Sequence, residues 1–292
     1  MSLSAPGVDL LTATDIRALT QRLGVRPTKT LGQNFVTDPG TVRRIVRTAQ
    51  VQPGEVVIEV GPGLGSLTLG LLAAGAQVIA VEVDPLLAGA LPDTITTHAP
   101  DHAGALTVLN RDALTPITTG VPATKLVSNL PYNVAVPVLL NFLEHHASLA
   151  QALVMVQAEV ADRIVAPPGS RTYGVPSAKV AWYAEATRAG SIGRTVFWPA
   201  PNVDSALVRL VRRDPPQTSA TRQQVFAVID AAFAQRRKML RSALAPWAGT
   251  TARAEQMLER AGVQPTLRGE RIGIAQFAAI AAAGQELGVG AP

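Results

Sequence analysis

The chain contains no cysteine among its 292 residues. Disulfides, thiolate metal sites and a cysteine nucleophile are therefore excluded, and no other set of metal ligands stands out. The sequence also lacks an apolar run of the ~18 residues that a transmembrane helix requires. Residues 1–15 lack the basic and then apolar segments of a signal peptide. These absences favour a cytoplasmic protein that binds neither a membrane nor a metal.

Aromatic residues are scarce, at 4%, yet 47% of the chain is hydrophobic. That share supports a substantial core and argues against global disorder. The length suits one large domain and one small domain. Nothing in the sequence requires an oligomer, and we expect a monomer.

Positive charge is in excess and unevenly distributed. The formal net charge is +5. Seven Arg or Lys residues face one acid between residues 17 and 47, and five face one acid between residues 222 and 241. Two basic segments far apart in the chain favour a polyanionic partner such as a nucleic acid. The alternative is the solvated surface of a basic protein.

Short apolar runs alternate with helix-like segments in the first two thirds of the chain. Strands separated by helices indicate βαβ units and a parallel sheet, so the fold class is α/β. A later segment, residues 203–210, alternates as a strand that could add an antiparallel edge. The parallel strands are expected at residues 56–60, 77–83, 106–109, 126–128 and 152–156, with helices such as 67–74 and 136–146 between them.

The predicted organisation has three parts. Residues 1–27 form an extension with one short helix near residues 15–23. Residues 28–213 form the α/β domain, and a proline-containing linker follows it. Residues 218–292 lack strand patterning and are expected to form a small all-α domain.

Polar residues and glycines follow successive predicted strands. A glycine-rich loop, EVGPGLG from Glu59 to Gly65, follows the first strand, Glu82 closes the second and Asp112 follows the third. Open parallel sheets bind ligands at the carboxyl ends of their strands, where glycines allow close approach to a ligand. An acid in the position of Glu82 accepts hydrogen bonds from ribose hydroxyls. The set favours a nucleotide or S-adenosylmethionine (SAM) over a plain strand–helix turn.

Asn129, Leu130, Pro131 and Tyr132 follow the fourth strand at the same edge. The exocyclic amine of adenine is a poor nucleophile because its lone pair is delocalised into the ring. The Asn129 amide oxygen and the Leu130 carbonyl could accept its two N–H bonds and favour a more localised lone pair. Pro131 would fix the turn, and Tyr132 would stack on the base. The alternative is a helix-entry turn with a buried tyrosine.

Together these motifs resemble the KsgA-type ribosomal RNA adenine dimethyltransferases, from about residue 28 to residue 277. The resemblance implies a Rossmann-like class I SAM-dependent methyltransferase domain followed by a helical domain. It also implies SAM as cofactor and N6 dimethylation of two adjacent adenosines in a hairpin loop near the 3′ end of 16S rRNA, in the small (30S) subunit or its precursor. The motifs are LGQNFVTD from residue 31, the glycine loop, NLPY from residue 129, FWPAPNVDS from residue 197 and AFAQRRK from residue 232.

The resemblance also implies a role for each matching residue. The set for SAM is Asn34, Val36, Gly61, Gly63, Glu82, Asp112 and Asn129. Phe197 would flank the target base opposite Tyr132, although the residues alone favour a structural phenylalanine there. A basic helix would bind RNA phosphates through Arg236, Arg237, Lys238 and Arg241.

Three other functions share these motifs. A 23S rRNA dimethyltransferase of the macrolide-resistance type shares the fold, but Leu130 and the basic helix favour the small-subunit enzyme. A non-catalytic assembly factor is disfavoured by the intact Asn129, Tyr132 and Glu82. A DNA adenine methyltransferase is the weakest of the alternatives.

Overall fold

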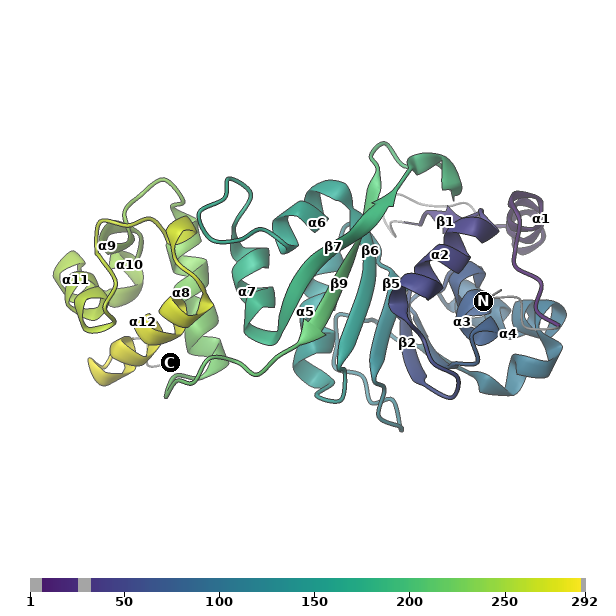
Figure 1. Ribbon diagram of the computed structural model, residues 1–292, viewed down its shortest axis with the longest axis horizontal. Coiled ribbons are helices and arrows are strands. Elements are labelled where there is room, and N and C mark those ends of the chain that lie inside the picture. Colours follow the sequence, from purple (N-terminus) through teal and green to yellow (C-terminus); the bar gives the residue numbers. More distant parts are fainter. Residues whose placement is uncertain (1–6, 26–32, 290–292) are drawn as a thin grey trace. The chain divides into compact units, whose positions relative to one another are not determined.

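The computed structural model describes residues 7–25 and 33–289, and the chain divides into two compact units (Figure 1). The first unit comprises Met1–Ala161 and Thr187–Arg212. The second comprises Asp162–Ala186 and Arg213–Pro292. The predicted sequence motifs from residue 33 to residue 205 all lie in the first unit.

A seven-stranded sheet forms the frame of the first unit, in the order β4-β3-β2-β5-β6-β9-β7. The five strands from β4 to β6 are mutually parallel, and β9 pairs antiparallel with β6. A separate antiparallel pair joins β1 (Phe35–Val36) to β8 (Phe197–Trp198). The strands of the large sheet are β2 (Val56–Val60), β3 (Gln77–Glu82), β4 (Leu106–Asn110), β5 (Lys125–Asn129), β6 (Gln151–Gln157), β7 (Ala184–Ile192) and β9 (Ser205–Arg212).

Each apolar run predicted as a parallel strand is a strand, which confirms the α/β class. The α-helices of the first unit follow the predicted alternation, and Asp84 caps α4 through a 2.9 Å bond from the Leu86 N–H to its Oδ1. Pro85 then occupies the first turn, where a missing N–H costs nothing. These helices are α1 (Ala13–Leu23), α2 (Pro39–Ala49), α3 (Ser66–Ala73), α4 (Pro85–His98) and α5 (Ala135–His145); η1 (Pro100–Ala105) and η2 (Arg194–Val196) are 3₁₀ turns.

The prediction of an antiparallel edge strand was wrong in one respect. β9 is antiparallel, as expected, but it lies inside the sheet because β7 pairs on its outer side. β7 was not predicted, since its sequence AEATRAGSI is small and polar and most of its residues are exposed or half-buried. Strand pairing there depends on a neighbour distant in sequence rather than on a local apolar pattern.

The second unit is helical. It contains α7 (Val175–Tyr183), α8 (Arg222–Ala234), α9 (Leu240–Ala243), α10 (Ala245–Ala248), α11 (Thr251–Arg260), α12 (Ile274–Glu286) and the 3₁₀ turn η3 (Gly269–Arg271). The helix α6 (Ala158–Ile164) spans the division between the units.

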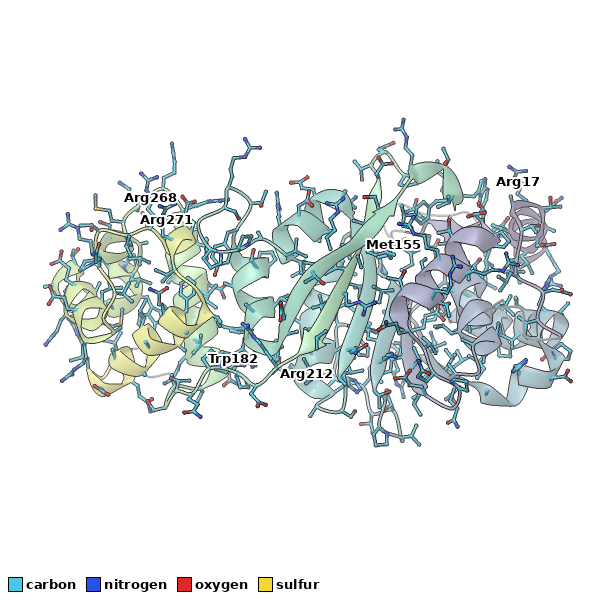
Figure 2. All side chains as sticks on the ribbon, viewed as in Figure 1. Arg17, Met155, Trp182, Arg212, Arg268 and Arg271 are labelled. Atoms are coloured by element: carbon cyan, nitrogen blue, oxygen red, sulfur yellow. The ribbon has the colours of Figure 1, made fainter. Side chains whose placement is uncertain are left out.

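Two predictions need correction in this unit. Residues 162–186 were assigned to the α/β domain but group with the C-terminal helices, because Trp182 and Tyr183 of α7 pack edge-on against Phe226 of α8. Trp182 is labelled in Figure 2. The predicted basic helix also ends early. Residue Gln235 is the non-helical C-cap of α8 at φ −127° and ψ 62°, so residues 236–238 form a turn after it.

Candidate functional site

The candidate site lies where the order of the strands reverses. From β2, the chain builds β3 and β4 on one side, and β5 and β6 on the other. Ligands of open α/β sheets bind in the crevice at such a point. The β2–β5 ladder pairs Val57 with Lys125 and Ile58 with Leu126. Beyond these pairs, the Ser128 hydroxyl accepts from Val60 N at 2.6 Å and donates to Val60 O at 3.2 Å. The serine side chain thus replaces the ladder at the carboxyl ends of these strands.

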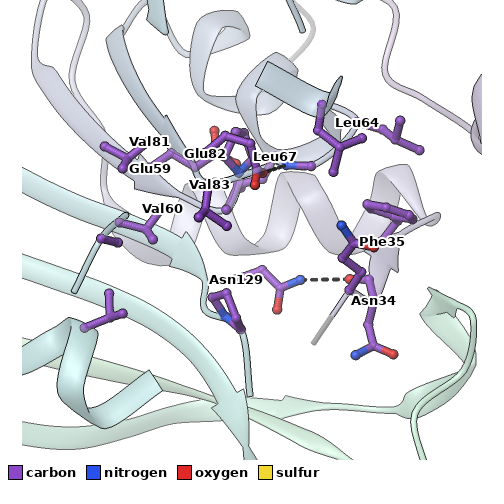
Figure 3. Close-up of a pocket in the computed structure, with 18 of the residues that line it drawn as sticks. Asn34, Phe35, Glu59, Val60, Leu64, Leu67, Val81, Glu82, Val83 and Asn129 are labelled. Carbon is purple, nitrogen blue, oxygen red and sulfur yellow. Dashed lines mark hydrogen bonds between the residues drawn. The ribbon is translucent and has the colours of Figure 1, made fainter. Parts of the chain in front are cut away.

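A cleft of about 870 Å³, counting the space open to solvent, occupies this edge (Figure 3). Eight residues that the sequence analysis singled out line it: Asn34, Val36, Gly61, Gly63, Glu82, Asp112, Asn129 and Pro131. Residues that it missed include Gln33, Phe35, Leu87, Val134 and Val138. The missed residues are mainly apolar, and an apolar wall carries no sequence signal that separates it from core.

The glycine loop brings its backbone close to the cleft. Gly61 and Gly63 have φ angles of 68° and 58°, which side chains disfavour. A methyl group on Gly63 would lie 2.8 Å from the Phe35 ring, so that ring rests directly on the loop. The Gly63 N–H donates to Glu82 Oε2 at 3.2 Å, which ties the loop to the end of β3. The loop is therefore shaped by contacts from both β1 and β3.

Glu82 is held in place by backbone groups. Its Oε1 accepts from Asp84 N at 3.0 Å, and Asn110 Nδ2 donates to the Glu82 carbonyl at 2.8 Å. Burial raises the pKa of Glu82, and the backbone N–H groups of Asp84 and Gly63 oppose that rise. Each carboxylate oxygen can accept a second hydrogen bond, so the group can still receive two hydroxyls.

Glu59 is a second buried acid at the cleft, and the sequence analysis gave it no separate role. It is 1% exposed, and Thr68 Oγ1 donates to its Oε2 at 2.7 Å. Burial raises the pKa of Glu59 to about 8, and the neighbouring Glu82 adds to the rise. The sequence signal that could have identified Glu59 as buried is its position in β2, whose other residues are all apolar.

In the Asn129 side-chain amide, the nitrogen has a hydrogen-bond partner and the oxygen has none among the described residues. Its Nδ2 donates to the Asn34 carbonyl at 3.0 Å, as the dashed line in Figure 3 marks. Its Oδ1 is buried and has no hydrogen-bond partner among the residues that the structure describes. A buried acceptor without a partner is costly and calls for an explanation such as a ligand. The bond to Asn34 orients the amide so that an acceptor is available at the cleft.

The other residues of the NLPY motif, which begins at Asn129, occupy different environments. Leu130 is buried, and its N–H donates to Met155 O at 3.1 Å. Tyr132 is half-buried and does not line the cleft; its hydroxyl lies 2.6 Å from Ser205 Oγ. Burial raises the pKa of Tyr132. The Ser205 contact was missed because it joins residues 73 positions apart.

Phe197 and Asp112 differ in exposure. Phe197 is 4% exposed in β8, where it pairs with Val36 of β1. Asp112 lies exposed at the rim of the cleft, and its Oδ1 accepts from Leu114 N at 2.9 Å. Asp112 therefore keeps its other oxygen for a ligand, whereas Phe197 offers little surface.

The four predicted RNA-binding residues lie in the second unit. Arg236 forms an ion pair with Glu270 at 3.2 Å, and Arg241 forms one with Glu255 at 2.9 Å. Arg237 and Lys238 are exposed in the turn after α8. Two of the four cations are thus partly occupied within the protein.

Within residues 7–25 and 33–289, no three His, Cys, Asp or Glu side chains are grouped so that they could hold a metal ion. Nor is any helix in these ranges long and apolar enough to cross a membrane.

The sequence profile of the family "Ribosomal RNA adenine dimethylase" matches residues 25–285. The chain belongs to this family. Ribosomal RNA small subunit methyltransferase A of Thermobifida fusca (strain YX) is 64% identical over 274 residues, which cover 93% of this chain and 95% of the relative. The protein of the same name from Streptomyces avermitilis is 61% identical over 282 residues, with 96% of each chain covered.

Solved structures agree on the fold. The crystal structure of 23S rRNA methyltransferase ErmE has a TM-score of 0.61 and 27% identity, covering 86% of this chain and 99% of its own. A dimethyladenosine transferase from Plasmodium falciparum has a TM-score of 0.72 at 20% identity, covering 87% and 98%, which shows the fold alone. The chain is a SAM-dependent ribosomal RNA adenine dimethyltransferase, and SAM is its cofactor.

Proposed function

We propose that the protein dimethylates N6 of two adjacent adenosines in a hairpin loop near the 3′ end of 16S rRNA, during biogenesis of the small subunit. The observation that carries the chemistry is the buried Asn129 Oδ1, an oriented acceptor without a partner at the cleft. The choice of the small subunit is supported by relatives that are named small subunit methyltransferases and are up to 64% identical. ErmE, named for 23S rRNA, is 27% identical.

The residues of the cleft fit SAM. Glu82 would receive the ribose hydroxyls, and Asp112 at the rim would accept from the adenine amino group. Gly61 and Gly63 would let the amino-acid end approach the backbone, with Asn34 and Val36 forming the opposite wall. The sulfonium of bound SAM supplies an electrophilic methyl group. No metal ion or covalent enzyme intermediate is required for transfer to an amine.

Two hydrogen-bond acceptors would orient the target amine. Asn129 Oδ1 would accept one N–H, and the Leu130 carbonyl the other, which aims the nitrogen lone pair at the methyl group. Tyr132 would stack on the base, with its ring orientation held by Ser205. Phe197 would need more exposure than its 4% to flank the base on the other side. The adenosine must leave its stack to enter, and an unpaired loop lowers that cost.

The second unit would bind RNA phosphates. Arg237 and Lys238 are exposed and could contact phosphates directly. Arg236 and Arg241 would either leave their ion pairs with Glu270 and Glu255 to bind a phosphate or contact both groups at once. We also propose that the protein acts as a monomer. A ribosomal substrate supports a cytoplasmic location.

The test is to incubate the protein with labelled SAM and under-methylated small subunits, and to map the modified adenosines. Large subunits in a parallel reaction are the control. Label on two adjacent adenosines of 16S rRNA alone is the expected result. Label confined to the large subunit would establish the 23S alternative. SAM binding without label in either subunit would favour a non-catalytic assembly factor.

A further inference from the structure

The exposed face of α2 is made of arginines. Arg43, Arg44 and Arg47 are spaced by three and four residues, which places them on one side of the helix. All three are exposed, while the opposite side is buried in the core through Val42, Ile45, Val46 and Ala49. We call these three residues the α2 arginine stripe. The site described above makes no use of them.

Within the described part of the chain, the positive charge of the stripe is offset only in part, through an electrostatic attraction between Arg43 and Asp38. No ion pair or hydrogen bond involves the side chains of Arg43, Arg44 or Arg47 there. Asp38 is the one acid between residues 33 and 50, and its Oδ2 is occupied by the N–H and hydroxyl of Thr41, both at 2.6 Å. Like charges four residues apart on a helix are destabilising. Three arginines beside one acid are therefore retained at a cost in stability, which suggests an external anion.

The stripe extends from the helix toward a neighbouring strand. A methyl group on Gly190 of β7 would lie 2.6 Å from Arg44 Nη2, so this glycine leaves space for the guanidinium. Arg44 thus lies over the end of β7, before the turn η2. The stripe is a surface shared by two elements of the first unit rather than a set of side chains extended into solvent.

The stripe also starts close to the cleft. α2 begins at Pro39, three residues after Val36, which lines the cleft. Arg43 lies only ~6 Å along the helix axis from Pro39, and Arg47 another ~6 Å further. A nucleotide whose base entered the cleft would have its flanking phosphates within reach of this end of α2.

We propose that the α2 arginine stripe binds the phosphates of the RNA strand that leads to the target adenosine. This inference rests on the proposed function. Guanidinium groups bind phosphate oxygens in pairs and keep their charge at all physiological pH values. A membrane surface fits less well, since a helix that lies in a lipid interface exposes apolar residues beside its cations. The large hydrophobic residues that are exposed in the described chain all lie outside α2.

The experiment compares two double variants of the full chain with equal loss of charge. Arg43→Gln with Arg47→Gln removes two stripe cations and spares Arg44, which packs against Gly190. The control, Arg253→Gln with Arg260→Gln, removes two exposed arginines of α11 that have internal partners, the Leu287 carbonyl at 2.8 Å and Glu286 at 3.4 Å. Binding to under-methylated small subunits is measured between ~50 and ~300 mM salt, with SAM affinity as a check on folding.

Each lost phosphate contact lowers the slope of log K against log salt by about 0.7–0.9. The stripe variant, which lacks two of these cations, should therefore lose about 1.4–1.8 from the slope and show a higher KM for subunits at unchanged kcat. The control variant should keep the wild-type slope. An unchanged slope in the stripe variant, or an equal loss in both variants, would overturn the inference.

Two further results distinguish failure of the proposed function from failure of the inference about the stripe. Binding is measured without methyl transfer, so a wild-type protein that binds small subunits but does not label them refutes the proposed function while the slope still decides the role of the stripe. Vesicles containing anionic lipid provide the other arm. Binding of the wild type but not the stripe variant to vesicles, with no change in the subunit slope, would assign the stripe to a membrane surface and overturn the inference.

Discussion

Replacing Asn129 with alanine separates the chemistry of the cleft from its folding. The substitution removes the 3.0 Å bond from Nδ2 to the Asn34 carbonyl, a loss of about 0.5–1.5 kcal/mol. It also removes the buried Oδ1, whose desolvation without a partner costs about 1–3 kcal/mol in the native protein. The two effects oppose each other. We therefore expect the free energy of unfolding of the SAM-free protein to change by no more than about 1–2 kcal/mol.

The rate of methyl transfer should respond far more strongly. Removing one oriented polar group that acts on the transition state costs about 10²–10³-fold in rate, or about 2.7–4 kcal/mol. The Asn129 amide would act on the amine as its lone pair localises, so the loss should appear in the chemical step. RNA affinity should change little, because phosphate contacts lie elsewhere.

The assay is single-turnover transfer from labelled SAM to saturating under-methylated small subunits. SAM affinity and urea unfolding are measured on the same samples. Asn202→Ala is a matched control, since it makes the same change at an exposed residue outside the cleft. Surface changes of this kind alter free energies by about 0.5 kcal/mol, so the control rate should stay within about twofold to threefold of the wild type.

A near-normal transfer rate in Asn129→Ala with SAM bound would refute the reasoning, because the amine would then be handled elsewhere. A fall in SAM affinity that matches the whole fall in rate would place Asn129 in cofactor binding alone. A loss of stability above ~3 kcal/mol would show that the bond to Asn34 holds the cleft together.

Burial raises the pKa of Glu59 from 4.5 to about 8, so the folded protein keeps a proton there that the unfolded chain releases. The free energy of unfolding of the SAM-free protein should therefore fall as pH rises from about 4.5 to 8, by up to about 5 kcal/mol, and Glu59→Gln should flatten this dependence in urea titrations. Ser205→Ala leaves the Tyr132 hydroxyl without its 2.6 Å partner and should lower kcat several-fold with unchanged SAM affinity; a normal kcat would assign the pair to packing. Charge reversal at Arg236 and Arg237 should weaken subunit binding and flatten its salt dependence, with Arg237→Glu costing more affinity and Arg236→Glu more stability, because Arg236 pairs with Glu270.

The inner parallel strands β2, β3, β5 and β6 could be predicted because they are mostly buried and read as apolar runs. Val56–Val60 and Gln151–Gln157 are examples, with nearly every residue inaccessible to solvent. The same reasoning fails for β7 and for the β1–β8 pair. A two-residue strand such as Phe35–Val36 has no periodicity, and its pairing with Phe197–Trp198 joins segments some 160 positions apart.

The residues of the site also divide into those with a local sequence signal and those without one. Glycines and acids at strand ends carry a local signal, because position on a parallel sheet brings consecutive strand ends together. That rule predicts that Gly61, Glu82 and Asn129 lie together, and all three line the cleft. Phe35 and Ser205 were not assigned, because each acts through a contact with a distant part of the chain, Phe35 with Gly63 and Ser205 with Tyr132.

These long-range contacts give the β1–β8 pair its importance for the chemistry. A two-residue ladder has little stability of its own. It is held by Ser66 Oγ donating to Val36 O at 2.7 Å and by Thr37 N and Oγ1 donating to Val196 O at 2.8 and 3.0 Å.

The strand fixed in this way is preceded by Asn34, whose carbonyl orients the Asn129 amide. It also contains Phe35, whose ring packs on the glycine loop. The segment that closes one wall of the proposed SAM cleft therefore also sets the direction of the proposed amine acceptor. Because both functions depend on one short segment, a change in its position would alter cofactor binding and methyl transfer together.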